Sequence, residues 1–130
     1  MAPRAFICGC SSTVLNADEE SFIRQSDPWG LILFKRNVAD RAQMRALTDR
    51  FRELTGRADA AVLIDQEGGR VQRMAAEHWP AYPSAARLAA AASDPAGQVD
   101  LVYLATRLIA HDLAEVGVNV DCLPVLDLPV

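Results

Sequence analysis

Short apolar runs alternate along the chain with segments in which apolar residues recur at helical spacing. Such runs, made mostly of aliphatic residues and bounded by polar or turn-forming ones, are typical of buried strands. They predict four strands, at residues 4–10, 31–34, 60–64 and 118–122.

Helix start and stop signals lie between these runs. Asn16, with Glu19 three residues later, predicts a capped helix that ends near Gln25. Asp40 predicts a second helix, which Gly56 should end. The apolar residues at helical spacing in this second helix are Met44, Leu47, Phe51 and Leu54.

A third, longer helix is predicted after Asp94 and Pro95, a favourable N-cap and first-turn pair. It should run to about Val116 and end at Gly117. The residues expected on its inner side are Leu101, Leu104, Leu108 and Ile109.

Almost wholly apolar strands separated by helices indicate an α/β fold with a parallel sheet. Such units build either an open doubly wound sheet or a (β/α)8 barrel, and a barrel needs about 250 residues. The 130 residues therefore predict the N-terminal half of a barrel, about four βα units, as one domain over 1–130 without an internal boundary. The last residues follow a strand directly, so we expect the other half, or a second copy, to cover the open sheet edges.

Composition and charge narrow the classes of ligand and partner that the chain could bind. The chain is 51% hydrophobic and carries a net charge of -4 without a Lys/Arg run, which argues against nucleic-acid and membrane partners and favours a small or neutral ligand. Cys8, Cys10 and Cys122 lie in apolar segments and predict reduced thiols rather than disulfides or a metal site. No cofactor is expected, and without a targeting signal or membrane-length apolar run we expect a cytoplasmic protein.

Charged residues follow the third predicted strand directly, in AVLIDQEGGRVQRM at residues 61–74. Asp65 is the first of them, and the carboxyl ends of parallel strands carry the ligand site in both architectures. A carboxylate accepts from sugar hydroxyls while Arg70 or Arg73 donates, so the chemistry suits sugar better than phosphate. An ion-paired loop with no ligand is the alternative that the residues leave open.

The string IDQEGGRVQR at residues 64–73 resembles the signature of family 3 glycoside hydrolases of the bacterial β-N-acetylhexosaminidase type. GLILFKRN at 30–37 and GVNVDCLPVLD at 117–127 are similar to two further strands of that family, in the same order. The resemblance implies a (β/α)8 barrel that removes terminal N-acetylglucosamine from peptidoglycan fragments, with retention, during recycling in the cytoplasm.

The resemblance also assigns roles within the motif. It implies that Asp65 and Arg73 bind the sugar, with Asp65 accepting from hydroxyls. Arg70 maps less clearly onto the substrate, and bracing of the loop fits it at least as well. Glu67 has the chemistry of an acid catalyst, yet we expect it to hold the loop.

No catalytic residue is predicted in this chain. The family's nucleophile is a later aspartate and its acid/base a histidine on a glycine-rich loop, whereas His78 and His111 fall on a connection and inside a helix. Asp127, just past the fourth strand, is interpreted as a brace.

We therefore expect a glycosidase as a complete protein and an inactive, sugar-binding chain in isolation. A non-catalytic sugar-binding or interaction domain is one alternative, because the visible residues serve binding alone. A family 3 β-glucosidase is another.

Overall fold

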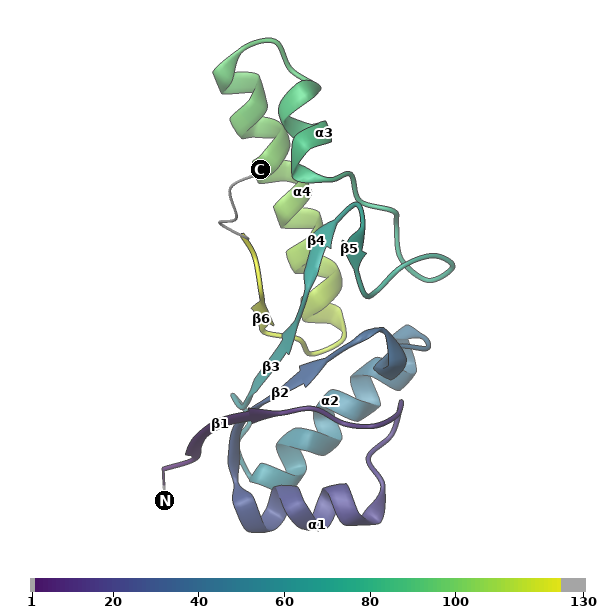
Figure 1. Cartoon of the computed structure of the whole chain (residues 1–130), viewed down its shortest axis with the longest axis vertical. Coiled ribbons are helices and arrows are strands. Elements are labelled where there is room, and N and C mark those ends of the chain that lie inside the picture. The colour runs from purple at the N-terminus through teal and green to yellow at the C-terminus, as the bar shows by residue number, and fades with distance from the viewer. Residues whose placement is uncertain (1, 125–130) are drawn as a thin grey trace.

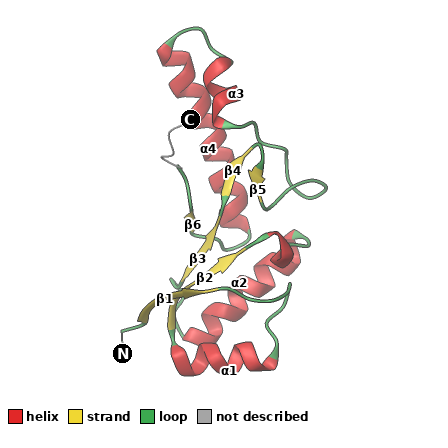
Figure 2. Cartoon of the chain, viewed as in Figure 1, coloured by secondary structure: helices red, strands yellow, loops and turns green. Residues whose placement is uncertain are grey.

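A computed structural model describes residues 2–124 (Figures 1 and 2). Helices and strands alternate over most of this range, as the hydrophobic pattern predicts. The elements are β1 (Arg4–Cys8), α1 (Ala17–Ser26), β2 (Pro28–Leu33), the 3-10 turn η1 (Lys35–Asn37), α2 (Arg41–Thr55), β3 (Ala61–Ile64), β4 (Gln66–Gly68), β5 (Val71–Gln72), α3 (Ala85–Ala90), α4 (Pro95–Glu115) and β6 (Val120–Asp121).

Four parallel strands form the main sheet in the order β1-β2-β3-β6, so that neighbours in the sheet follow one another along the chain. The register pairs Leu33 with Ile64, and Ile64 in turn with Asp121. β4 and β5 form a separate antiparallel hairpin directly after β3. The predicted parallel sheet is confirmed.

The helices cover one face of this sheet. Leu31, Leu33, Val62 and Ile64 form a single core cluster with buried residues of α1, α2 and α4. Leu63 alternates with them along β3 and lies outside that cluster. Doubly wound sheets carry helices on both faces and reverse their strand order at a switch point. Helices on one face and strands in chain order are instead the arrangement of a barrel wall.

The predicted helix starts are confirmed by their caps. The Asn16 side chain accepts from the Glu19 amide at 2.9 Å, and the Glu19 carboxylate accepts from the Asn16 amide at 2.9 Å. Asp40 and Asp94 accept from the third amide of α2 and α4 in the same way. Each cap satisfies a first-turn amide that has no partner within its helix.

The predicted inner face of α4 is only partly right. Ile109 is buried, and Asp112 and Leu113 continue its stripe at helical spacing. Leu104 and Leu108 are each 57% exposed, so their prediction as inner residues is wrong. Leu108 precedes Ile109 by one position, and the turn of about 100° per residue carries it off the buried stripe.

The strands are shorter than predicted at several ends. β1 ends at Cys8 instead of residue 10, and the last strand spans only Val120–Asp121. The hairpin β4–β5 and the short helix α3 were not predicted. Apart from Val71, the hairpin consists of polar and glycine residues, which do not form the alternating apolar pattern that predicts a strand.

Asp127, predicted to act as a brace, lies outside the described residues. Within residues 2–124, no helix has both the length and the apolar composition that crossing a membrane requires.

Replacing Gly117 by Ala is expected to destabilise the chain more than replacing Gly56 by Ala. Both glycines have a left-handed backbone, with φ of 79° and 65°, which costs a non-glycine residue about 1 kcal/mol. A Cβ on Gly56 meets open space, whereas one on Gly117 collides with the Thr48 hydroxyl and lies 2.9 Å from Arg52 Nη1. Overpacking of this kind costs about 1–3 kcal/mol more. Urea unfolding of both variants measures the difference, and equal losses would contradict the packing argument.

Candidate functional site

Asp65 and Arg73 meet at the carboxyl end of β3. The Arg73 Nη2 atom donates to Asp65 Oδ2 at 2.6 Å, and the two side chains are 30% and 24% exposed. Strand alternation places Asp65 on the same face as Leu63, opposite the helices. The structure thus joins the two residues predicted to bind sugar into one half-buried pair on the face that a barrel would enclose.

The hairpin between them depends on two glycines with left-handed backbones, Gly68 at φ 85° and Gly69 at φ 61°. A Cβ on Gly68 would collide with the Pro83 carbonyl, and one on Gly69 would lie 2.7 Å from the Ser84 Cβ atom. The Gly69 amide donates to the Tyr82 carbonyl at 2.7 Å. The interpretation that these glycines shape the loop is confirmed.

Gln66 holds the hairpin together from within. Its side chain is fully buried, and its Oε1 atom accepts from the Arg73 amide at 2.9 Å and from the Met74 amide at 3.0 Å. Its Nε2 atom donates to the Met74 carbonyl at 2.8 Å. This role was not predicted. The position of Gln66 between two acids could have indicated it, because a side-chain amide both donates and accepts hydrogen bonds, whereas a carboxylate only accepts them.

The described residues show no bracing by Glu67 or Arg70. Neither side chain makes a hydrogen bond or an ion pair within residues 2–124, and Arg70 is exposed. Glu67 is half-buried and borders a cavity behind the hairpin. The bonds expected of Glu67 come from its neighbour Gln66.

A second set of contacts anchors the far end of the loop. The Tyr82 hydroxyl donates to Asp112 Oδ2 at 2.6 Å, and both residues are buried. Arg41 lies 3.4 Å from Asp112 Oδ1, and its guanidinium stands 5.4 Å from the centre of the Trp79 ring. Burial and the Asp112 carboxylate raise the pKa of Tyr82, so its hydroxyl stays a donor. The loop from Arg73 to Tyr82 is thereby fixed to α2 and α4.

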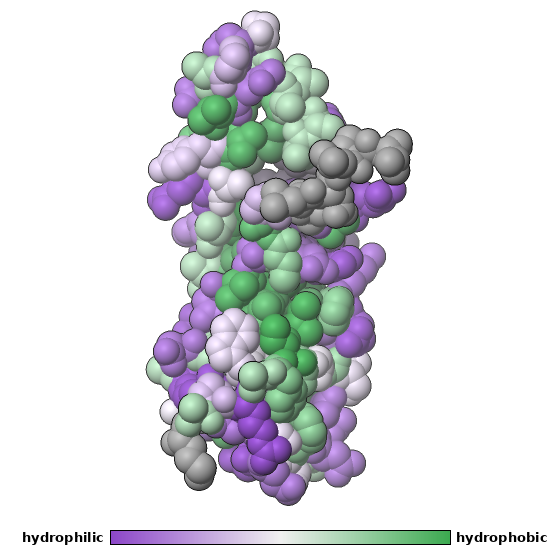
Figure 3. Space-filling model, turned by 60° about the vertical axis from the view of Figure 1, so that its left-hand side comes forward, coloured by the Kyte–Doolittle hydropathy of each residue, from purple (hydrophilic) through white to green (hydrophobic). Residues whose placement is uncertain are grey.

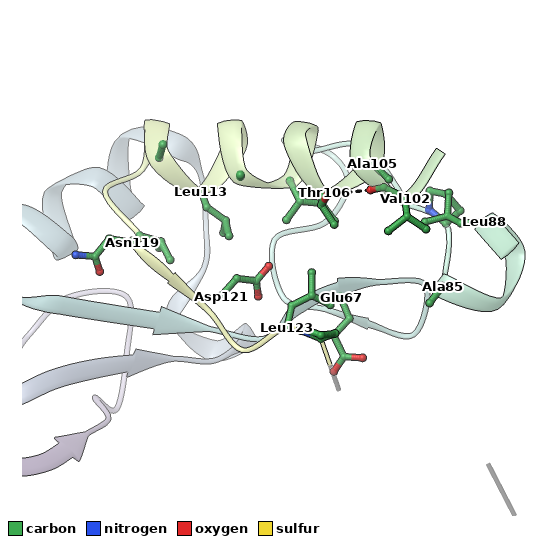
Figure 4. Close-up of a pocket in the computed structure, with 16 residues that line it drawn as sticks. Glu67, Ala85, Leu88, Val102, Ala105, Thr106, Leu113, Asn119, Asp121 and Leu123 are labelled. Atoms are coloured by element: carbon green, nitrogen blue, oxygen red, sulfur yellow. Dashed lines mark hydrogen bonds between the residues drawn. The ribbon is translucent and has the colours of Figure 1, made fainter. Parts of the chain in front are cut away.

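Asp121 lies on the helix side of the sheet, behind Asp65. It pairs with Ile64, and its Oδ1 atom accepts from the Gln66 amide at 3.0 Å. Figure 4 shows its carboxylate directed into a cavity of about 760 Å³ between α4, β6 and the hairpin. Burial, followed by the Asp65 and Glu67 charges, raises the pKa of Asp121 to about 6 against the opposing effect of the Gln66 bond.

The thiols and histidines lie where the sequence predicts. Cys10 is buried, Cys8 and Cys122 are half-buried, and all three are free. Burial and the nearby Asp65 carboxylate raise the pKa of the Cys122 thiol. His78 and His111 are exposed, and neither hydrogen-bonds to Asp65 or Arg73. Residues 2–124 contain no cluster of side chains suited to a metal ion.

Parallel strands in chain order and helices on one face define part of a (β/α) barrel, and the carboxylate–guanidinium pair lies at the strand end where such barrels carry their ligand sites. The family profile "Glycosyl hydrolase family 3 N terminal domain" matches residues 9–129. The chain belongs to glycoside hydrolase family 3.

Relatives agree in sequence and in fold. A "Beta-hexosaminidase" of Xylella fastidiosa is 37% identical over 94% of this chain and 36% of its own length. One of Methylococcus capsulatus is 40% identical over 88% of this chain and 33% of its own. The crystal structure of NagZ from Neisseria gonorrhoeae in complex with N-trifluoroacetyl-D-glucosamine has a TM-score of 0.84 at 28% identity, covering 97% of this chain and 37% of that one. The chain therefore spans little more than a third of the relatives it matches.

Replacing Asp121 by Asn is expected to raise the melting temperature of the chain more at about pH 7.5 than at about pH 4. The folded-state pKa of about 6 lies above the ordinary value of about 3.9, so the folded state binds this proton more tightly. The stability that the neutral carboxyl contributes is present below the ordinary pKa and is lost as pH rises through about 6, whereas Asn stays uncharged.

Thermal unfolding at the two pH values measures this effect. Asp59→Asn is the matched control, because it removes an exposed carboxylate. An Asp121→Asn offset that is the same at both pH values would show that burial does not govern this group.

Proposed function

We propose that this chain is the sugar-binding N-terminal part of an enzyme that removes terminal N-acetylglucosamine from β-linked peptidoglycan fragments, with retention. The Asp65–Arg73 pair carries this proposal, because it lies at the carboxyl end of a strand within the family match. Peptidoglycan recycling in the cytoplasm is the setting that the family resemblance implies.

The chemistry of the pair supports sugar binding. Asp65 Oδ2 accepts from Arg73, and a carboxylate with its two oxygens can accept further hydrogen bonds, here from sugar hydroxyls. Arg73 supplies further N–H donors, and its Nε atom is buried without a partner in the described part of the chain. Donors and acceptors side by side match a ring that bears hydroxyl and acetamido groups.

The relatives support an N-acetylated sugar over glucose. The Neisseria structure holds N-trifluoroacetyl-D-glucosamine, and a Paenibacillus structure with a TM-score of 0.79 at 28% identity is a family 3 β-N-acetylglucosaminidase. It covers 92% of this chain and 22% of that one. We assign the same substrate class to the enzyme that this chain belongs to.

The chain alone is proposed to carry residues that bind sugar but not the residues that cleave it. Retaining hydrolysis needs an attacking group and a proton donor on either side of the scissile bond, usually about 5–5.5 Å apart. Asp65 is tied to Arg73, and the two histidines are exposed and make no bond to this pair. The groups that attack and protonate are therefore assigned to other parts of the enzyme.

The open sides of the structure support a partner for the barrel wall. Figure 3 shows a band of hydrophobic side chains along one face of the molecule. Near β1, Phe22 and Trp29 are 49% and 44% exposed, and on α4, Tyr103 and Leu108 are 62% and 57% exposed. Apolar area of this extent favours burial against another structural element. We propose that the remainder of a barrel, or a second copy of the chain, covers these edges.

Replacing Asp65 by Ala in the complete enzyme is expected to lower kcat/KM for a chromogenic β-N-acetylglucosaminide by roughly 10- to 100-fold. Hydrogen bonds to a charged group contribute about 1.5–3 kcal/mol, and Arg73 would also lose its partner. Steady-state kinetics measures the loss. Asp59→Ala, at the opposite end of β3, is expected to retain normal kinetics. Normal kinetics for the Asp65 variant would overturn the sugar-binding assignment.

The purified 130-residue chain is expected to show no turnover of the same substrate. Calorimetry with N-acetylglucosamine distinguishes the proposed enzyme from a self-sufficient sugar-binding domain. Weak or absent binding together with an uncooperative melt favours a barrel that needs its other half. Tight binding together with a cooperative melt would favour the independent domain, and measurable hydrolysis would overturn the assignment of catalysis to other parts.

A further inference from the structure

Asp121 connects the last described strand to the residues that carry the sugar-binding pair. The ladder between β3 and β6 ends where the Cys122 amide donates to the Ile64 carbonyl at 2.9 Å. The next amide on that side of the chain belongs to Gln66, and it is satisfied by the Asp121 side chain at 3.0 Å. The carboxylate thus extends the ladder by one bond beyond the strands.

The residue held in this way is the one that organises the hairpin. Gln66 directly follows Asp65, so a shift of its amide moves Asp65 as well. Its side-chain oxygen accepts from the Arg73 and Met74 amides, so the same shift moves Arg73. The positions of both Asp65 and Arg73 therefore depend on the backbone at Gln66, which the Asp121 side chain holds in place.

Asp121 acts from behind the site. Its register with Ile64 places it on the helix-covered face, whereas Asp65 lies on the opposite face. Its surroundings in the cavity are mainly apolar residues of α4, including Ile109 and Leu113. Its carboxylate therefore does not lie on the face of the sheet that carries the Asp65–Arg73 pair.

We propose that Asp121 is a positioning residue for the Asp65–Arg73 pair, acting through Gln66, and that loss of its charge in acid weakens sugar binding. This inference rests on the proposed function. It extends that function by naming a group outside the IDQEGGRVQR string that sets how well the residues of that string bind.

The charges around Asp121 give the pH dependence a direction. Asp65 and Glu67 lie close enough to act on it with like charge, and Cys122 follows it directly after β6. Among the described residues, those of α3 and α4 that line the cavity have no titratable side chains, and neither does Pro83. With a pKa of about 6, Asp121 is ionised above that pH and accepts strongly from the Gln66 amide. Protonation below it leaves a weaker, neutral acceptor.

The test measures KM and kcat of the complete enzyme with a chromogenic β-N-acetylglucosaminide. Asp121→Leu, which removes the acceptor, is expected to raise KM about ten-fold at about pH 7.5 and only about three-fold at about pH 5, where the unaltered enzyme has itself lost the charged acceptor. Asp121→Asn keeps a neutral acceptor, so its KM should be about three-fold above that of the unaltered enzyme at about pH 7.5 and should match it at about pH 5. This convergence is a readout that a purely structural role does not produce.

Asn119 offers the matched control. Its Oδ1 atom accepts from the Val62 amide at 2.8 Å, so it makes the same kind of bond between β6 and β3 at the other end of the pairing. Asn119→Ala is expected to lower the melting temperature while leaving KM within about two-fold. A rise in KM equal to that of Asp121→Leu would show that strand pairing in general, rather than Asp121, sets the site.

Asp65→Ala separates the two proposals. Normal kinetics for that variant overturns the proposed function itself. The positioning role alone is overturned by a different result. In that case Asp65→Ala severely lowers kcat/KM, but the KM of Asp121→Asn relative to the unaltered enzyme does not change with pH. Should Asp121→Leu fail to fold, the Asp121→Asn profile decides the question.

Discussion

Burial of one sheet face under α1, α2 and α4 is the constraint on which the rest of this structure depends. Strand residues alternate between faces, so those that join the common core are committed to the helix side. Asp65, which follows Ile64, is left on the side without helices. The face that receives a ligand is thus decided by the hydrophobic effect along the strands, before any polar contact is considered.

The loop that presents the pair is built almost entirely from its own residues. Gln66 bonds to Arg73 and Met74, and Gly69 bonds to the carbonyl of Tyr82. The Asp121 carboxylate, from β6, ties this arrangement to the main sheet through the Gln66 amide. Local contacts of this kind cost little chain entropy to form, because the residues they join are close in sequence.

Ionisation of Asp121 has opposite effects on the stability of the fold and on its hydrogen bond to the hairpin. Burial raises its pKa, so the ionised form is unfavourable for the fold. The same ionised form is the stronger partner for the Gln66 amide. A neutral side chain would stabilise the chain and hold the hairpin less firmly, which is the pattern expected of residues retained for a site.

Much of the fold was predictable because its signals are local. Asn16, Asp40 and Asp94 cap helices through contacts within three residues, and such contacts can be read directly from spacing. The pairing of Asp65 with Arg73 could also be predicted, because both lie in one motif. The role of Gln66 could not be predicted, since its side chain is uncharged and its importance depends on complete burial.

Other errors arose from tertiary contacts. Leu104 and Leu108 match the composition of an inner face, but the packing of α4 on the sheet buries Leu113 beside the correctly predicted Ile109 and leaves both leucines exposed. Asp121 looked like an ordinary strand residue. Its significance follows only from the register that sets it beside Ile64 and within reach of the Gln66 amide.

The segment between Met74 and Tyr82 is anchored by hydrogen bonds at both ends and contains a short exposed stretch. Gln66 fixes Met74, and Asp112 fixes the Tyr82 hydroxyl, whereas residues 76–78 are exposed. Insertions within those three positions leave both anchors in place. In evolution, this stretch can therefore lengthen without disturbing the Asp65–Arg73 pair.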